Sequence, residues 1–102
     1  MEIPFKKHTF LITGASSGIG LCIALKALRD GHMVIGTARN ISKASEKHPE
    51  FAAAKGKWLQ LDITAPDTQE IIKRTVEESD VDVLINNAAL LPLERGGYTL
   101  TS

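Results

Sequence analysis

The sequence predicts an α/β fold: a parallel sheet of four strands in the order 3-2-1-4, with helices on both faces in a three-layer αβα arrangement. Apolar runs typical of buried strands alternate with stretches of helical periodicity, which gives the order βαβαβαβ. The second run is apolar almost throughout, as in a parallel strand buried on both faces. Right-handed crossovers then place the first strand inside the sheet, as in the N-terminal half of a doubly wound fold.

The first part of the chain supplies two strands and a helix. The apolar run at residues 8–12 predicts the first strand, and residues 21–28 predict a helix. The second strand is expected at residues 33–38. Cys22, the one cysteine of the chain, is expected on the buried face of the first helix, where it would pack as a small apolar side chain.

The second part continues as helix, strand, helix, strand and loop-like tail, expected at residues 43–54, 57–61, 67–78, 81–86 and 87–102. Ser42 is the expected N-cap of the first of these helices, and Pro49 is expected to interrupt it. With 102 residues, the chain is expected to form a single domain that is incomplete relative to a full doubly wound sheet.

Composition limits the classes of function. The apolar fraction of 43% and the charged fraction of 24% are ordinary for a globular protein, and the formal net charge is zero. Without a basic patch, neither nucleic acid nor an anionic membrane is an expected partner. The sequence has no signal-peptide pattern or membrane-spanning apolar run, and it has a single cysteine, so we expect a cytoplasmic protein. The three histidines are scattered, and no metal site is expected.

A glycine-rich stretch, TGASSGIG at residues 13–20, lies between the first strand and the first helix. Gly14 can adopt backbone angles closed to other residues, Gly18 leaves room for a phosphate beside the backbone, and Gly20 lets helix and strand approach closely. The N–H groups and dipole of a helix N-terminus favour an anion at this turn. Hydroxyl donors are added there by Ser16 and Ser17. The alternative is an ordinary strand–helix connection.

Arg39 follows the second strand, at the edge where open α/β sheets bind ligands. An acidic residue near this point would bind the adenosine ribose of NAD. Arg39 can instead pair with the 2′-phosphate of NADP, and the apolar Ala38 supplies no carboxylate to repel that phosphate. NADP is therefore expected, and NAD is less favoured. The alternative is a solvated charge at a strand end.

Polar side chains also follow the third and fourth strands. Asp62 directly follows the third strand, where an aspartate can bond its own backbone in a turn. Asn86 and Asn87 end the fourth strand, where an asparagine pair can likewise form a turn.

Together these segments resemble the classical short-chain dehydrogenases/reductases. Residues 13–20 match the TGxxxGIG cofactor loop, residues 61–64 resemble an LDVT segment, and residues 86–89 resemble the NNAG motif with Ala89 in place of glycine. The resemblance extends over residues 9–89. The extended, epimerase-type relatives have a different glycine spacing and match less well.

The resemblance implies a Rossmann-type fold that binds a dinucleotide. In the family, the residues after the third strand line the adenine pocket, so the resemblance implies that the Asp62 carboxylate accepts a hydrogen bond from the adenine amino group. The residues after the fourth strand lie against the ribose on the nicotinamide side. The implied cofactor-binding residues here are Gly14, Ser16, Ser17, Gly18, Ile19, Gly20, Arg39, Asp62, Ile63, Asn87 and Ala88.

The catalytic pattern of the family is missing. The family uses a tyrosine as general acid/base with a lysine four residues later, but Tyr98 is followed at that position by Ser102. No catalytic residue is assigned, and this chain alone is expected to be inactive. It then represents the NADP(H)-binding part of an oxidoreductase, a nucleotide-binding or regulatory module that pairs with another chain, or a structural relic. An exposed fourth strand would favour self-association or a partner chain.

Overall fold

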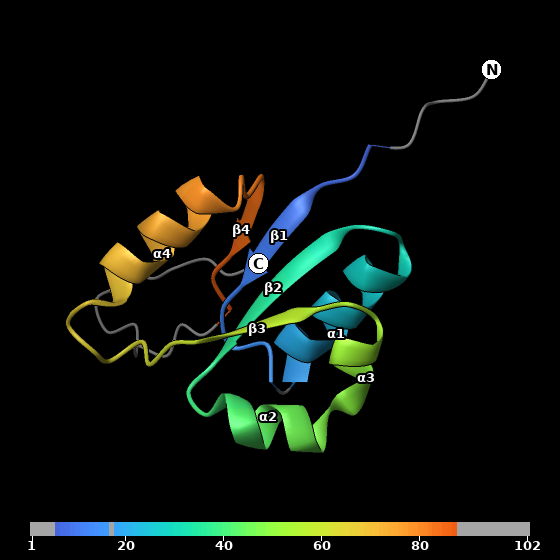
Figure 1. The fold of residues 1–102 in the computed structure, drawn as a ribbon, viewed down its shortest axis with the longest axis horizontal. Coiled ribbons are helices and arrows are strands. Elements are labelled where there is room, and N and C mark those ends of the chain that lie inside the picture. Colours follow the sequence, from blue (N-terminus) through green and yellow to red (C-terminus); the bar gives the residue numbers. More distant parts are fainter. Residues whose placement is uncertain (1–5, 17, 88–102) are drawn as a thin grey trace.

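The computed structural model of the protein describes residues 6–16 and 18–87. Four parallel strands form one sheet in the order β3-β2-β1-β4 (Figure 1). The strands are β1 (Thr9–Ile12), β2 (Met33–Ala38), β3 (Lys57–Gln60) and β4 (Val83–Ile85). The predicted fold class and strand order are therefore confirmed.

Four helices flank this sheet. They are α1 (Gly18–Arg29), α2 (Ile41–Lys47), α3 (Pro49–Ala53) and α4 (Thr68–Glu78). The first three cover one face of the sheet, and α4 lies on the other (Figure 1). This distribution follows from right-handed crossovers, because the chain moves outward from β1 to β3 and then returns past β1 to β4.

The register brings the carboxyl ends of the strands to one edge of the sheet. Ile12 of β1 lies between Gly36 of β2 and Ile85 of β4, and Ala38 of β2 pairs with Gln60 of β3. The segments that leave these strands therefore meet at that edge. This is the edge where parallel α/β sheets hold ligands.

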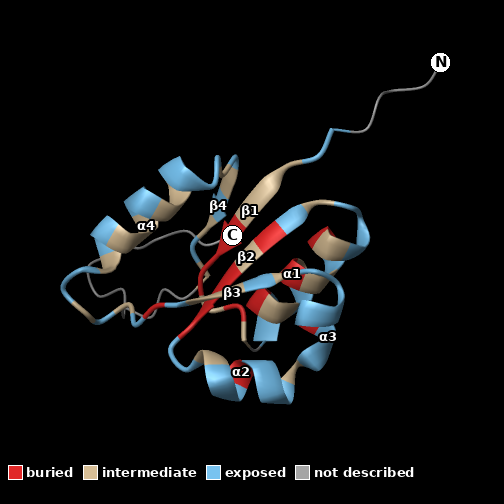
Figure 2. Cartoon of the chain, in the orientation of Figure 1, coloured by how far each residue is buried: buried red, intermediate tan, exposed pale blue. Residues whose placement is uncertain are grey.

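The buried core lies between the sheet and the helices α1 to α3 (Figure 2). Its largest member, Phe51, is fully buried, with its ring 4.3 Å from the ring of Trp58 between centroids. The remaining buried members are Ile12, Ala15, Ala24, Ala27 and Val34.

The burial of α1 corrects one prediction. Cys22 is exposed, because α1 turns Gly20, Ala24 and Ala27 toward the sheet. These small residues allow the helix axis to lie close to the strands, which places Cys22 on the outer side.

The start of α2 corrects another. Ser42 lies inside the helix, and the N-cap is Asn40, whose side-chain oxygen accepts a hydrogen bond of 3.0 Å from the Lys43 N–H. The interruption expected at Pro49 is confirmed, because Pro49 begins the separate helix α3. The predicted tail, apart from Asn87, lies outside the described residues.

Candidate functional site

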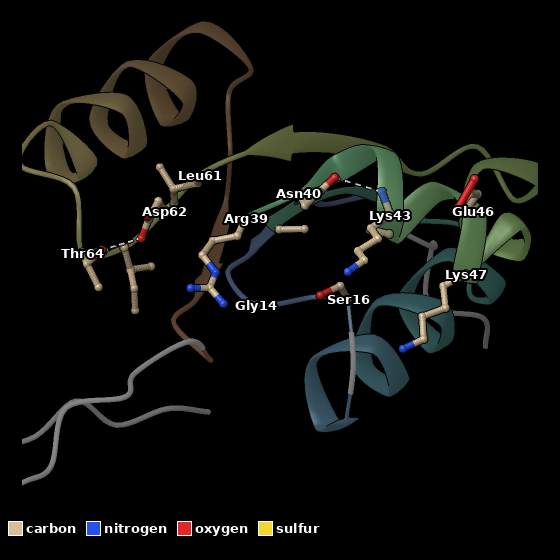
Figure 3. Close-up of a pocket in the computed structure, with 13 residues that line it drawn as sticks. Gly14, Ser16, Arg39, Asn40, Lys43, Glu46, Lys47, Leu61, Asp62 and Thr64 are labelled. Atoms are coloured by element: carbon tan, nitrogen blue, oxygen red, sulfur yellow. Dashed lines mark hydrogen bonds between the residues drawn. The ribbon is translucent and has the colours of Figure 1, made fainter.

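A cleft of about 1150 Å³ opens at the carboxyl ends of β1, β2 and β3 (Figure 3). Its walls come from the turn after β1, from α2 and from the segment after β3. The lining residues are Gly14, Ser16, Ala38, Arg39, Asn40, Lys43, Ala44, Glu46, Lys47, Leu61, Asp62, Ile63 and Thr64. The strand-end segments predicted to form a site therefore do meet in space.

The turn after β1 has the backbone geometry that the glycines were expected to allow. Gly14 and Gly18 have positive φ angles of 66° and 58°, which side chains other than glycine rarely adopt. A Cβ built on Gly18 would meet no atom of the described residues within 4 Å, so the backbone at the start of α1 has open space beside it in this part of the structure. The neighbouring Ile19 is 70% exposed, although it is a large apolar residue. The start of α1 thus leaves room for a ligand.

Gly20 serves a different purpose, which is close packing. A Cβ at this position would collide with the Gly14 carbonyl oxygen and the Asn87 side-chain amide. The Asn87 Nδ2 donates a hydrogen bond of 3.1 Å to that same carbonyl. Gly20 is buried, so α1 and the end of β4 both close on the turn after β1.

Two asparagines connect the end of β4 to the turn. The Thr13 hydroxyl donates to Asn86 Oδ1 at 3.0 Å, and Asn87 reaches Gly14 as described above. The backbone adds to this link, because the Thr13 N–H donates to the Ile85 carbonyl at 3.0 Å. The asparagine pair thus bonds to the turn from a position far along the chain.

One wall of the cleft carries three cationic side chains. Arg39 follows β2, and Lys43 and Lys47 lie one turn apart on α2. Figure 3 shows Arg39 and Lys43 extending toward the same space beside Ser16. Within the described residues, none of these three cations forms an ion pair. The space beside Arg39 and Lys43 suits a ligand with negative charge, although the Glu46 carboxylate of α2 also lines the cleft.

The opposite wall contains Asp62 in a tight local turn. Its Oδ1 accepts hydrogen bonds from the Thr64 hydroxyl at 2.6 Å and the Thr64 N–H at 3.0 Å. These bonds, first the hydroxyl and then the N–H, lower the pKa of Asp62, and the Arg39 guanidinium lowers it further. Asp62 is thus a turn aspartate, and none of the hydrogen bonds among the described residues uses its second oxygen, Oδ2.

The predicted residues divide into several groups. Gly14, Ser16, Arg39, Asp62 and Ile63 line the cleft together. Gly18, Ile19 and Gly20 begin α1 beside it, while Asn87 packs behind the turn. Ser17 and Ala88 lie outside the described residues.

Sequence reasoning missed Lys43 and Lys47. Their spacing of four residues puts two cations on one helix face, which was the available signal. That this face turns toward the cleft could be known only from the structure.

Two further observations concern the described part of the chain. Its His, Cys, Asp and Glu side chains form no group of three that could hold a metal ion. None of its helices has the length and apolarity needed to cross a membrane.

Comparison with known proteins identifies relatives. A sequence model of the family described as short chain dehydrogenase matches residues 8–99. Oxidoreductase claN of Passalora fulva is 46% identical over 93 residues, which cover 91% of this chain and 39% of that protein. The 3-oxoacyl-[acyl-carrier-protein] reductase FabG of Escherichia coli is 38% identical over 88 residues, covering 84% of this chain and 36% of that protein.

Solved structures of dehydrogenases also resemble this chain. A short-chain dehydrogenase from Streptomyces avermitilis superposes with a TM-score of 0.67 at 32% identity, covering 82% of this chain and 31% of that one. The bulky-bulky ketone specific alcohol dehydrogenase from Comamonas testosteroni gives 0.66 at 32% identity, covering 86% of this chain and 38% of that one. The chain therefore spans well under half the length of these relatives. The glycine turn, the strand order and these matches together show that the chain belongs to the short-chain dehydrogenase family.

Proposed function

We propose that this chain is the NADP(H)-binding portion of a short-chain dehydrogenase/reductase-type oxidoreductase. The observation that carries the proposal is the cationic wall of Arg39, Lys43 and Lys47 in a cleft that also contains the glycine turn. An NADP molecule has negative charge at two points, the pyrophosphate and the 2′-phosphate. The helix N-terminus suits the first and the cationic wall suits the second.

The residues have separable roles in this proposal. The pyrophosphate would lie at the start of α1, where Gly18 leaves open space and Ser16 adds a hydroxyl. Arg39 would pair with the 2′-phosphate, and Asp62 would accept a hydrogen bond from the adenine amino group through its second oxygen. The bound dinucleotide supplies hydride-transfer chemistry.

Discrimination between the two dinucleotides tests the proposal. Calorimetric titration of the wild-type chain should give tighter binding of NADPH than of NADH, and Arg39→Ala should remove about ten- to hundredfold of that preference. Arg29→Ala is the matched control, because Arg29 is exposed in the last turn of α1 and does not line the cleft. Equal NADPH affinity in wild type and Arg39→Ala would contradict the assignment.

We also propose that the chain by itself does not catalyse turnover. The positioned acid that must supply a proton with the hydride contributes about 10²–10⁴ in rate, and the chain offers no tyrosine–lysine pair at the family's spacing. Tyr98 and Ser102 lie outside the described residues. An NADPH-consumption assay with carbonyl substrates should give background rates, and turnover above background would overturn this part.

A second candidate is a nucleotide-binding or regulatory module that pairs with another chain. The observation that favours it is the edge of β4: among the described residues this strand pairs with β1 alone, and Leu84 is 48% exposed. Size-exclusion chromatography tests this candidate, since a stable monomer at micromolar concentration would count against it.

For both candidate functions we propose a cytoplasmic location. The single cysteine, Cys22, is free and exposed and would persist as a thiol in a reducing compartment.

A further inference from the structure

The turn after β1 is bonded on both sides before any ligand enters. Besides the links to β4 described above, it has three attachments to β2. The Gly14 N–H donates to the Thr37 hydroxyl at 3.1 Å, and the Ala15 N–H donates to the Thr37 carbonyl at 2.9 Å. The Ala15 side chain is fully buried and packs at Gly36, where a Cβ would lie 2.8 Å from it.

Thr37 is unusual among these partners because its side chain is polar and buried. The residue is 1% exposed, yet both its hydroxyl and its carbonyl accept hydrogen bonds from the turn. The hydroxyl accepts from the Gly14 N–H, and the carbonyl accepts from the N–H of the next residue, Ala15. Consecutive residues of a strand point to opposite faces, so Thr37 and Gly36 hold the turn from both faces of β2.

We propose that Thr37 is a positioning residue that preforms the phosphate-binding turn. The inference rests on the proposed function for its effect on the cofactor. Thr37 holds Gly14 in its positive-φ conformation and occupies the N–H groups of Gly14 and Ala15. Among the described residues of the turn and the start of α1, the N–H groups that would face an anion are then those of Ser16 and of Gly18 and the residues after it, and not those of Gly14 and Ala15. A turn that is already in this conformation needs no reordering when the dinucleotide binds.

The key variant is Thr37→Val, which keeps the branched shape and removes the acceptor. The Gly14 N–H then loses its partner, and the turn populates other conformers in which that group reaches water. The apparent affinity falls by the fraction of chains that retain the competent conformer. We expect NADPH to bind about tenfold more weakly to Thr37→Val, while Thr37→Ser, which keeps the hydroxyl, binds within about twofold of wild type.

Thr75→Val provides a matched control. The Thr75 hydroxyl donates at 2.8 Å to the Ile71 carbonyl within α4, remote from the cleft. This variant removes a hydroxyl by the same substitution and should bind NADPH like wild type. Affinities are compared at a temperature where thermal unfolding shows every variant to be folded.

A second readout needs no cofactor. In the free wild-type chain the Gly14 amide should exchange with deuterium about tenfold more slowly than in Thr37→Val, and Thr37→Ser should retain the protection. A merely structural role for Thr37 would lower global stability without this local change at Gly14.

The two readouts separate the failures. If wild type does not bind NADPH, the proposed function fails, and the exchange of Gly14 still decides the role of Thr37. If wild type binds but Thr37→Val binds equally well, the inference is overturned. It is also overturned if the wild-type Gly14 amide exchanges as fast as an unstructured amide, a result that does not depend on any variant folding.

Discussion

The two faces of the sheet are packed in contrasting ways. On the face covered by α1, α2 and α3, a cluster of fully or nearly fully buried side chains surrounds Phe51. On the other face, α4 contains no buried residue, and Ile71, Ile72 and Val76 are only partly covered. The fully buried Leu11 lies in the sheet outside the cluster around Phe51.

This contrast in packing shows which part of the fold supports the cleft. The helices of the packed face also supply the start of α1 and the cations of α2, so the best-packed part of the molecule carries the ligand-facing groups. The α4 face contributes to the cleft through the segment that precedes the helix, at Asp62 to Thr64. We therefore expect substitutions on the α1–α3 face to affect both the free energy of unfolding and ligand binding. Substitutions on the α4 face should affect one of these properties without the other.

The largest expected effect comes from Phe51→Ala. The ring is fully buried, and it fills the space beside Gly36 and Gly56 as well as contacting Trp58. Its removal should lower the free energy of unfolding by about 3–5 kcal/mol, measured by urea titration. The comparison variant Ile72→Ala, on α4, should cost about 1 kcal/mol or less. Similar costs for the two variants would refute the contrast between the faces.

The next effect concerns ligand binding on the packed face. Gly18→Val puts a branched side chain into the open space at the start of α1, so NADPH binding should fall below detection in a fluorescence titration. The positive φ should cost about 1–2 kcal/mol of stability as well. Gly31→Val imposes a similar strain at a φ of 94° in the turn after α1 and should leave binding intact. If Gly18→Val binds like wild type, the phosphate does not lie there.

The smallest expected effect is on the pH dependence of stability, through Asp82 just before β4. The Thr9 N–H donates to Asp82 Oδ2 at 3.0 Å, and this bond, aided by His8, lowers the pKa of Asp82. A lowered pKa gives stability that is present above the ordinary carboxyl value of about 4 and is lost as the pH falls through the folded value. The melting temperature of Asp82→Asn should therefore decrease less steeply than that of wild type between about pH 5 and pH 2. An unchanged acid limb would exclude Asp82 as a contributor.

Sequence reasoning was sufficient for the fold because the information is local and repetitive. The apolar runs define four strands, and right-handed crossovers in a doubly wound pattern predict the order 3-2-1-4 that the sheet has. The phase of α1 was harder, because its inward face carries glycine and alanines instead of large apolar residues. That choice of small residues is why Cys22 was assigned to the wrong side.

The site was predictable where its residues directly follow strands and unpredictable where they depend on helix orientation. Arg39 and Asp62 follow β2 and β3 and were found, whereas Lys43 and Lys47 depend on how α2 turns after its cap at Asn40. Thr37 was missed because a threonine inside an apolar strand has no sequence signal for a hydrogen bond to a distant N–H. The binding role of these residues stays a prediction.

The break between α2 and α3 at Pro49 has a consequence for engineering. It makes α2 a separate helix with a single buried residue, Ala44, while the other α2 residues that line the cleft, Lys43, Glu46 and Lys47, are exposed. Residues 39–47 can therefore be exchanged as a cassette, with Ala44 kept and Phe51 and the turn after β1 untouched, to measure whether they set the dinucleotide preference that we propose.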